Sequence, residues 1–499
     1  MVSFLFFIIL IKCLIIPFLF SKTEGSRPFV PRYPHLDPLL GLDLVIRSWW
    51  DFNNGRLSEG FRQRHLAYGP TYVANTFGAP CIYTIEPANI RWITTEGFEQ
   101  FGKAGWVKEA AKHIGDGILM NEGAAWKYSR KTLKPIFSRT AVNEPALLEP
   151  HVQHLIKNMR RLSETAGSFD FHHLASMFTL DVVTDFLFGK STRCLGRGAK
   201  QTSHQHGLRF LALVKYFEGP SGKFIAIGPL AWLSLFTSYK RLIGVVNGMK
   251  AFFRMQLDEI IAEMSSGGSK GLAEGREIPP SVFRTMKAAG ISDNQIQGEL
   301  QNVFFASYDT TSTFLANLMY ILSQHPDTQH RLREEIAFLG QRLPTAKELS
   351  TMKFLRMVIM EALRLYSPVS SHSRTAKVTT TLPTGGGSDG RSPIPITAGT
   401  TVVWSTYSLN RDPRLYGEDW AAFRPDRWTT ARDFFMPFGS GPRACLGQQM
   451  VQTEVMYVVV RLLQEFSQIS MAAGECNKPF KEAKAVSFYS DGGVHICIK

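Results

Sequence analysis

The chain has 499 residues, of which 44% are hydrophobic and 20% are charged, and 56 Lys and Arg against 42 Asp and Glu give a formal net charge of +14. This composition excludes a disordered or collagen-like chain, and the length suits one large catalytic domain or several smaller ones. Six cysteines without a C-x-x-C pair exclude a disulfide scaffold and a zinc site built on such pairs. No run of Lys and Arg reaches the length of a nucleic-acid-binding arm, so the positive charge favours a membrane surface or an acidic protein partner.

The first segment is an apolar run over residues 4–20, and basic residues follow it at several positions of 22–32. A run of about 17 residues is at the lower edge of what spans a bilayer, and Lys12 within it can extend its side chain toward the interface. A cleaved signal peptide is the alternative. It is disfavoured because no Lys or Arg precedes the run and no A-x-A-like site follows it. We predict a membrane anchor over residues 1–21, with the body of the protein in the cytosol because of the basic flank.

A connector and one large body follow the anchor. Residues 22–35 contain three closely spaced prolines, which favour an extended connector. Residues 36–499 carry no internal repeat and no long polar linker, and most of them have helical periodicity with a few short extended runs. One helix is predicted from a cap at Ser292 to Pro326, roughly 30 residues or about 45 Å. These patterns predict a mainly α fold of the α+β class.

The long predicted helix contains A-S-Y-D-T-T at residues 306–311. Asp and two consecutive Thr are poor helix formers, because their side-chain oxygens compete for backbone groups. Two interpretations stay open. The segment is either a satisfied polar notch in a buried helix, or a site where Asp309 and Thr310 hold a carboxylate and a hydroxyl for proton delivery.

A second signal is F-G-S-G-P-R-A-C-L-G at residues 438–447, which precedes an apolar helix. Cys445 is expected at the N-terminal end of that helix, where the helix dipole and free N–H groups lower the pKa of a thiol. The surrounding glycines let backbone amides approach the sulfur, and Arg443 can face an acidic group of a cofactor. This pattern indicates a metal-bound thiolate rather than a buried structural cysteine.

The loop resembles the haem-binding loop F-G-x-G-x-R-x-C-x-G of the cytochrome P450 monooxygenases. E-A-L-R at residues 361–364 is similar to the E-x-x-R of that family, and F-R-P-D-R-W at 423–428 is similar to its P-E-R-F-like meander. Glu361 and Arg364 are one helical turn apart, so we expect them to pair and to hold Arg427 in a buried charge triad. The resemblance covers essentially the whole chain and implies the cytochrome P450 fold, with a long central helix, small β-sheets and an N-terminal anchor.

The resemblance also implies haem b as cofactor, with Cys445 as the axial ligand of its iron. Trp126 and Arg130, in W-K-Y-S-R, match the family's W-x-x-x-R, whose polar ends hold a haem propionate. Arg374 aligns with another propionate ligand. Charge-assisted hydrogen bonds from Arg130, Arg374 and Arg443 would suit this dianionic cofactor.

Residues 306–311 resemble A-G-x-D-T-T of the family, in which the residue at Thr310 hydrogen-bonds dioxygen and the residue at Asp309 relays protons. Ser307 stands where the family usually has Gly. A serine hydroxyl can bond a backbone carbonyl and bend a helix, so we expect the oxygen groove to persist. The family layout also implies that Phe488 reaches the substrate pocket.

Several stretches resemble the fungal alkane and fatty-acid hydroxylases, among them residues 115–118, 126–130 and 134–137. We therefore expect residues 36–499 to form a haem-thiolate monooxygenase domain that hydroxylates a lipophilic substrate with a long alkyl or polyketide chain, using O2, in fungal secondary-metabolite biosynthesis. A housekeeping terminal hydroxylase of n-alkanes or fatty acids is the alternative. No flavin domain is recognisable, so the resemblance implies a separate NADPH–cytochrome P450 reductase and a location on the cytosolic face of the endoplasmic reticulum membrane. No nucleic-acid partner is expected.

Two further functions are compatible with parts of the pattern. An oxygen-independent haem-thiolate rearrangement or dehydration needs no proton relay, so the presence of Asp309 and Thr310 argues against it. A non-catalytic haem-binding membrane protein would not require a Glu361–Arg364–Arg427 framework together with that relay.

Overall fold

A computed structural model of the chain describes residues 29–499, with the backbone alone at a few helical positions and without residues 106, 109–113, 139–143, 197–200, 228–238, 266–280, 431 and 477. The anchor predicted at residues 1–21 and most of the connector predicted at 22–35 lie outside the described residues. Among the helices that are described, none combines the length and the apolar character needed to cross a membrane.

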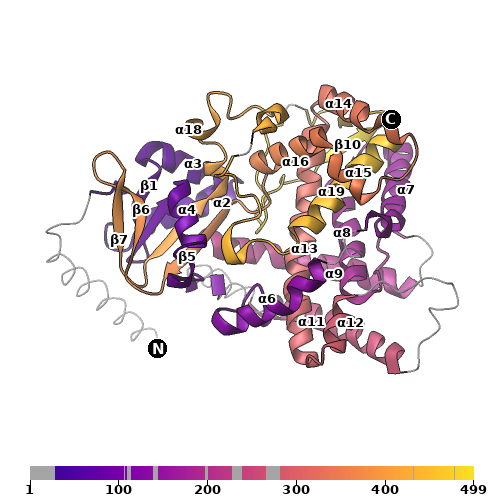
Figure 1. The fold of residues 1–499 in the computed structure, drawn as a ribbon, viewed down its shortest axis with the longest axis horizontal. Coiled ribbons are helices and arrows are strands. Elements are labelled where there is room, and N and C mark those ends of the chain that lie inside the picture. The colour runs from indigo at the N-terminus through magenta and orange to yellow at the C-terminus, as the bar shows by residue number, and fades with distance from the viewer. Residues whose placement is uncertain are drawn as a thin grey trace.

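Helices make up most of the described chain, as predicted (Figure 1). The longer ones are α2 (Leu42–Asn53), α3 (Leu57–Tyr68), α4 (Pro87–Thr94), α6 (Gly123–Phe137), α7 (Glu149–Ala166), α8 (Phe171–Phe188), α9 (Gln201–Ile227), α11 (Tyr239–Ser265), α13 (Asp293–Leu322), α14 (Pro326–Ile336), α16 (Lys353–Leu365) and α19 (Gln448–Glu465). The shorter ones are α12 (Val282–Ala288), α15 (Ala346–Thr351), α17 (Thr406–Leu409), α18 (Pro413–Tyr416) and the 3-10 turns η2 (Phe98–Gln100), η4 (Pro145–Leu147), η7 (Ala337–Leu339), η8 (Pro425–Thr429) and η9 (Gly441–Arg443).

Within the part of the chain that the structure describes, the strands form three small sheets. The largest has the order β1 (Thr71–Thr76), β2 (Ala79–Thr84), β8 (Thr401–Ser405), β5 (Ser371–Ala376) and β3 (Phe101–Gly102). The other two are β4 (Phe169–Asp170), β10 (His495–Ile498) and β9 (Ile469–Met471), and the hairpin of β6 (Thr380–Gly386) and β7 (Ser392–Ile396). In the largest sheet β2 and β8 run parallel, while its other neighbours are antiparallel. This sheet lies at one end of the molecule and most of the long helices lie at the other (Figure 1).

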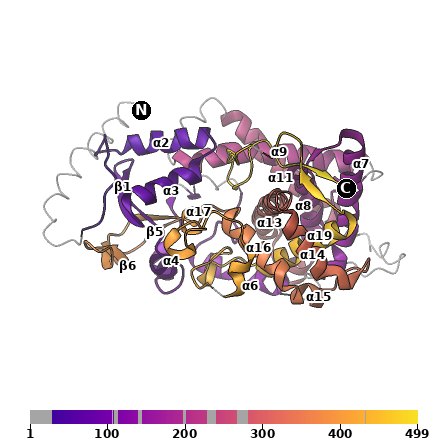
Figure 2. The ribbon, with the colours of Figure 1, turned by 90° about the horizontal axis from the view of Figure 1, so that it is seen from above.

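Helix α13 is the central element of the helical part. It begins after Ser292 and ends at Leu322, close to the limits predicted from the sequence. Its C-terminal half is buried in a large apolar core that α7, α8, α16 and α19 share, and Figure 2 looks almost along its axis. A fully buried Leu such as Leu315 or Leu318 contributes about 1.5–3 kcal/mol relative to an exposed one. Packing on several sides therefore fixes the position of residues 306–311.

A buried charge cluster joins α16 to the meander around η8. The carboxylate of Glu361 accepts hydrogen bonds from Arg364 Nε and Nη2 at 2.9 and 2.8 Å, from Arg427 Nε at 2.9 Å and from Trp428 Nε1 at 2.9 Å. The side chains of Glu361, Arg364 and Arg427 are fully buried. Burial disfavours the charged carboxylate, but its hydrogen bonds and the nearby guanidinium charges hold the pKa of Glu361 below its usual value. The meander that precedes the Cys445 loop is thus fastened to the helical core.

The replacement Glu361→Gln should lower the free energy of unfolding by about 3–5 kcal/mol, because it leaves the buried guanidinium of Arg364 without its counter-charge and that of Arg427 with Asp419 alone. The free energy is measured by denaturant unfolding followed by circular dichroism. Asp426→Asn is the control in the same meander, since the ion pair of Asp426 with Arg331 is about half exposed, and it should cost less than about 1 kcal/mol. Equal losses for the two variants would contradict a structural role of the buried cluster.

Candidate active site

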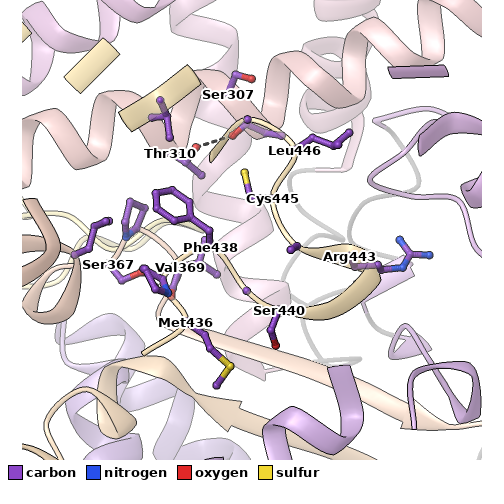
Figure 3. Close-up of a pocket in the computed structure, with 18 of the residues that line it drawn as sticks. Ser307, Thr310, Ser367, Val369, Met436, Phe438, Ser440, Arg443, Cys445 and Leu446 are labelled. Carbon is purple, nitrogen blue, oxygen red and sulfur yellow. Dashed lines mark hydrogen bonds between the residues drawn. The ribbon is translucent and has the colours of Figure 1, made fainter. Parts of the chain in front are cut away.

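A largely apolar cavity of about 380 Å³ lies between α13 and the loop that precedes α19. The loop contributes residues between 436 and 447, and further walls come from α6, from α16 and from the chain that follows α16. The α13 wall consists of Val303, Ala306, Ser307, Thr310, Thr311 and Phe314. The sulfur of Cys445 faces this space across from Thr310 (Figure 3). A cavity of this kind suits an apolar ligand with a few oriented polar groups.

The Cys445 loop is held in a tight backbone conformation. Cys445 N–H donates to the carbonyl of Phe438 at 2.9 Å. Gly441 has a φ of 68°, and a Cβ at this position would lie 1.8 Å from the carbonyl oxygen of Thr94. Only glycine fits there, because the left-handed conformation and the missing side chain are both required. The loop therefore packs directly against the last residue of α4.

The pKa of the Cys445 thiol is raised above its usual value, not lowered as the sequence predicted. Burial is the largest cause, and it outweighs the backbone N–H of Gly447 and the positive charge of Arg130, both of which favour the thiolate. The exposed surface of Cys445 opens into the cavity. A metal ion bound at the sulfur would supply the positive charge that holds it as a thiolate. Among the described residues, no three His, Cys, Asp or Glu side chains gather around a possible ion.

Three of the four residues predicted to hold an acidic cofactor group line the cavity, namely Trp126, Arg130 and Arg443. Arg130 Nη1 donates to the Ala444 carbonyl at 3.0 Å. Arg443 Nη2 donates to the Asn121 carbonyl at 2.7 Å, and its guanidinium lies 4.5 Å from the centre of the Trp126 ring. Figure 3 shows that Arg443 points away from the sulfur of Cys445. The guanidinium group of Arg443 is therefore offset from the sulfur, as acidic groups at the edge of a large cofactor would require.

Arg374, the fourth of these residues, is not among the side chains that line the cavity. Its Nη1 donates to the carbonyl of Ser373 at 2.8 Å, and burial lowers the pKa of its guanidinium. Its charge nevertheless acts on the cavity edge, because it lowers the pKa values of Arg443 and of a lysine that the sequence reasoning missed, Lys103.

Lys103 lies next to the two arginines at the end of β3. Burial, followed by the positive charges of Arg443 and Arg374, lowers the pKa of Lys103 to about 7. The same two effects, burial and the charge of Arg374, lower the pKa of Arg443 to about 10. Glu122 is the carboxylate that opposes these shifts, and it also pairs with Lys108. This excess of partly buried positive charge fits a cofactor that carries two carboxylates at one edge, as haem b does.

The two residues of the 306–311 segment that are predicted to deliver protons, Asp309 and Thr310, point to different surroundings. Thr310 lines the cavity, and its Oγ1–H donates to the carbonyl of Ala306 at 2.6 Å within a continuous helix (Figure 3). Asp309 is not among the cavity-lining residues, and its carboxylate accepts a hydrogen bond from the hydroxyl of Ser487 near the C-terminus. Burial raises the pKa of Asp309 to about 6, and the bond from Ser487 opposes that rise. Ser307, at the position where Gly was expected, also lines the cavity.

The expectation that Phe488 reaches the pocket is wrong. Its ring stacks on Phe480 with centroids 5.1 Å apart and lies 5.3 Å from the ring of Tyr407. Its backbone N–H donates to the carbonyl of Pro368 at 2.9 Å. Phe488 is thus part of an aromatic cluster and is not among the residues that line the cavity.

Comparison with known proteins agrees with this geometry. The family model described as Cytochrome P450 matches residues 31–493. "Cytochrome P450 monooxygenase FPY7" of Fusarium mangiferae is 31% identical over 484 residues, which cover 96% of this chain and 90% of the relative. "Cytochrome P450 monooxygenase himC" of Aspergillus japonicus is 32% identical, over 95% of this chain and 84% of the relative. "Cytochrome P450 52A5" of Candida maltosa is 34% identical, over 81% and 78%.

The match spans nearly the whole described chain and includes both the Cys445 loop and α13. Members of the matched family bind haem b through a cysteine thiolate and use O2 together with a redox partner. The chain therefore belongs to the cytochrome P450 family and is a cytochrome P450 monooxygenase.

Proposed function

We propose that Cys445 is the thiolate ligand of haem b in this protein, and that Trp126, Arg130, Arg374 and Arg443 hold the cofactor's acidic edge together with Lys103. The observation that carries this proposal is the arrangement of one sulfur in an apolar cavity, with an excess of positive charge offset from it. Haem with a thiolate ligand supplies dioxygen activation after two electrons have arrived.

Two residues of α13, Thr310 and Asp309, deliver the protons that the reaction consumes. Thr310 presents its hydroxyl oxygen to the cavity, and rotation of its hydrogen away from the Ala306 carbonyl would let it donate to dioxygen and receive a proton in return. Asp309 has a pKa of about 6, so its carboxyl group can gain and lose a proton near neutral pH. The apolar walls exclude water and bind the chain of the substrate. The balanced reaction converts a C–H bond, O2, NADPH and H⁺ into a C–OH group, water and NADP⁺.

The substrate class proposed is a lipophilic molecule with a long alkyl or polyketide chain, oxidised in fungal secondary-metabolite biosynthesis. The mostly apolar lining of the cavity supports a lipophilic substrate. The sequence resemblance to fungal alkane and fatty-acid hydroxylases favours a second candidate, the terminal hydroxylation of n-alkanes or fatty acids as a housekeeping reaction. Both candidates use the same site residues.

Electrons are proposed to come from a separate NADPH–cytochrome P450 reductase. The apolar run that begins the chain and its basic flank support an anchor at residues 1–21, a connector at 22–35 and a catalytic domain at 36–499. We place this domain on the cytosolic face of the endoplasmic reticulum membrane, in contact with membrane lipid.

The replacement Cys445→Ala should abolish the thiolate-type Soret shift of the reduced CO complex, because the variant has no sulfur at this position of the cavity. The measurement is a reduced-CO difference spectrum of the membrane-bound protein. Cys476→Ala is the matched control, since Cys476 is exposed and does not line the cavity, and it should keep the shift. Retention of the shift in Cys445→Ala would overturn the ligand assignment.

The replacement Lys103→Met should speed the loss of haem to an acceptor such as apomyoglobin by about 10-fold or more, because one charge-assisted hydrogen bond to the cofactor is lost. Lys127→Met is the control, since the Lys127 side chain is 61% exposed on α6 and pairs with Glu99. If both variants release haem at the wild-type rate, Lys103 has no part in holding the cofactor.

The replacements Asp309→Asn and Thr310→Ala should each increase the H2O2 released per NADPH oxidised. Each variant lacks one of the two groups proposed to deliver protons, and a positioned proton donor contributes on the order of 100-fold to proton transfer. In the wild type, the peroxide fraction should fall as the pH is lowered from 8 toward 6, since a group with a pKa of about 6 becomes more protonated over that range. Asp309→Asn should show no such dependence. Thr313→Ala is the control, because Thr313 is buried in the same helix but does not line the cavity. An unchanged peroxide yield in both variants would mean that another group delivers the protons.

A further inference from the structure

The loop between β9 and β10 brings a buried hydroxyl to the carboxylate of Asp309. The side chain of Ser487 donates its hydrogen bond to Asp309 Oδ2, and only 4% of Ser487 is exposed. Asp309 and Thr310 are neighbours on α13, so their side chains leave the helix about 100° apart. Thr310 faces the cavity, whereas Asp309 is turned toward Ser487. The direction of the Asp309 carboxylate therefore depends on a residue from a distant part of the chain.

The position of Ser487 is set by backbone contacts that do not involve Asp309. The N–H of the next residue, Phe488, donates to the carbonyl of Pro368 at 2.9 Å, and the carbonyl of Phe488 accepts from Asn317 Nδ2 at 2.8 Å. Asn317 lies eight residues after Asp309 on α13, about 12 Å along the helix. The loop is thus attached to the same helix at a second point, and it presents the Ser487 hydroxyl in a fixed place.

The base of the loop is fixed as well. The N–H of Ala483 donates to the carbonyl of Tyr489 at 2.8 Å, which closes the loop around Ser487. The carboxylate of Glu482 accepts hydrogen bonds from the N–H and the hydroxyl of Ser58, both at 2.8 Å, at the start of α3. These contacts leave the Ser487 side chain little freedom, so its bond to Asp309 costs little further ordering.

Hydroxylation and peroxide release consume the same number of protons, and they differ in where the protons are delivered. Hydroxylation consumes a C–H bond, O2, NADPH and H⁺ and yields C–OH, H2O and NADP⁺. Peroxide release consumes O2, NADPH and H⁺ and yields H2O2 and NADP⁺. Without hydroxylation, full reduction consumes O2, 2 NADPH and 2 H⁺ and yields 2 H2O and 2 NADP⁺. Each path that avoids peroxide needs a proton donor in the correct place, so the orientation of Asp309 decides the outcome.

We propose that Ser487 is a positioning residue that orients the Asp309 carboxyl for proton delivery, so that the C-terminal loop controls how much reduced oxygen escapes as peroxide. This inference rests on the relay function proposed for Asp309. Ser487 does not line the cavity, and it acts through Asp309 alone.

The test measures H2O2 released per NADPH oxidised by the full-length, haem-loaded protein in membranes with NADPH–cytochrome P450 reductase, with and without dodecanoic acid as a probe. Ser487→Ala should raise this ratio severalfold, and Ser487→Thr, which keeps the hydroxyl, should restore the wild-type value. Ser487→Cys is close in volume to serine but offers only a weak donor, so it should give an intermediate ratio and serves if the Ala variant does not fold. Correct folding is checked by the reduced-CO spectrum.

Ser176→Ala is the matched control. Ser176 is 2% exposed on α8, its hydroxyl donates to the carbonyl of His172 at 2.9 Å, and it does not line the cavity. It should leave the peroxide ratio unchanged. A wild-type ratio in Ser487→Ala, or a raised ratio that Ser487→Thr does not restore, would overturn the proposal for Ser487. If Asp309→Asn also has a wild-type ratio, the relay itself fails; if Asp309→Asn raises the ratio and Ser487→Ala does not, only the positioning role fails.

Discussion

The rest of the site depends on the buried ion pairs that the carboxylate of Glu361 forms with two arginines. This carboxylate binds Arg364 on its own helix and Arg427 in the meander, and both guanidinium groups are fully buried. Charges withdrawn from water in this way are tolerated only when each has its partners in place. Arg364 also donates to the carbonyls of Asn410, Trp420 and Ala422, which joins the chain before the meander to the same cluster. The path of the backbone toward Cys445 is therefore fixed before any cofactor contact is made.

A second constraint is the imbalance of charge beside the cavity. Burial lowers the pKa values of Lys103, Arg374 and Arg443, the charge of Arg374 lowers those of Lys103 and Arg443 further, and the charge of Arg443 also lowers that of Lys103. Such a cluster is destabilising by itself, so the folded chain is poised to gain stability from an anionic group at this edge. The thiol of Cys445 is in the complementary situation, because burial keeps it protonated until a cation binds the sulfur. Both features fit one ligand that carries a metal at its centre and carboxylates at its rim.

Much of the fold and part of the site could be predicted from local pattern. The limits of α13 followed from its periodicity and from the stop at Pro326, and the resemblance of the Cys445 loop to the haem-binding loop agreed with the family match. Lys103 and Ser487 could not be predicted, because their partners are distant in sequence and neither lies in a recognisable motif. The predicted direction of the pKa shift of Cys445 was wrong, because a helix N-terminus can be recognised in the sequence whereas the depth of burial of a side chain cannot. Phe488 was misplaced for the same reason, since competition between two apolar environments is decided by tertiary packing.

The central claim is that Cys445 binds the iron of haem b as a thiolate. Electron paramagnetic resonance of the purified ferric protein tests it most directly. The account predicts a rhombic low-spin signal of the cysteine-thiolate type in the wild-type protein and its absence in Cys445→Ser. A nitrogen- or oxygen-ligated signal in the wild type, or an unchanged thiolate signal in the variant, would contradict the account.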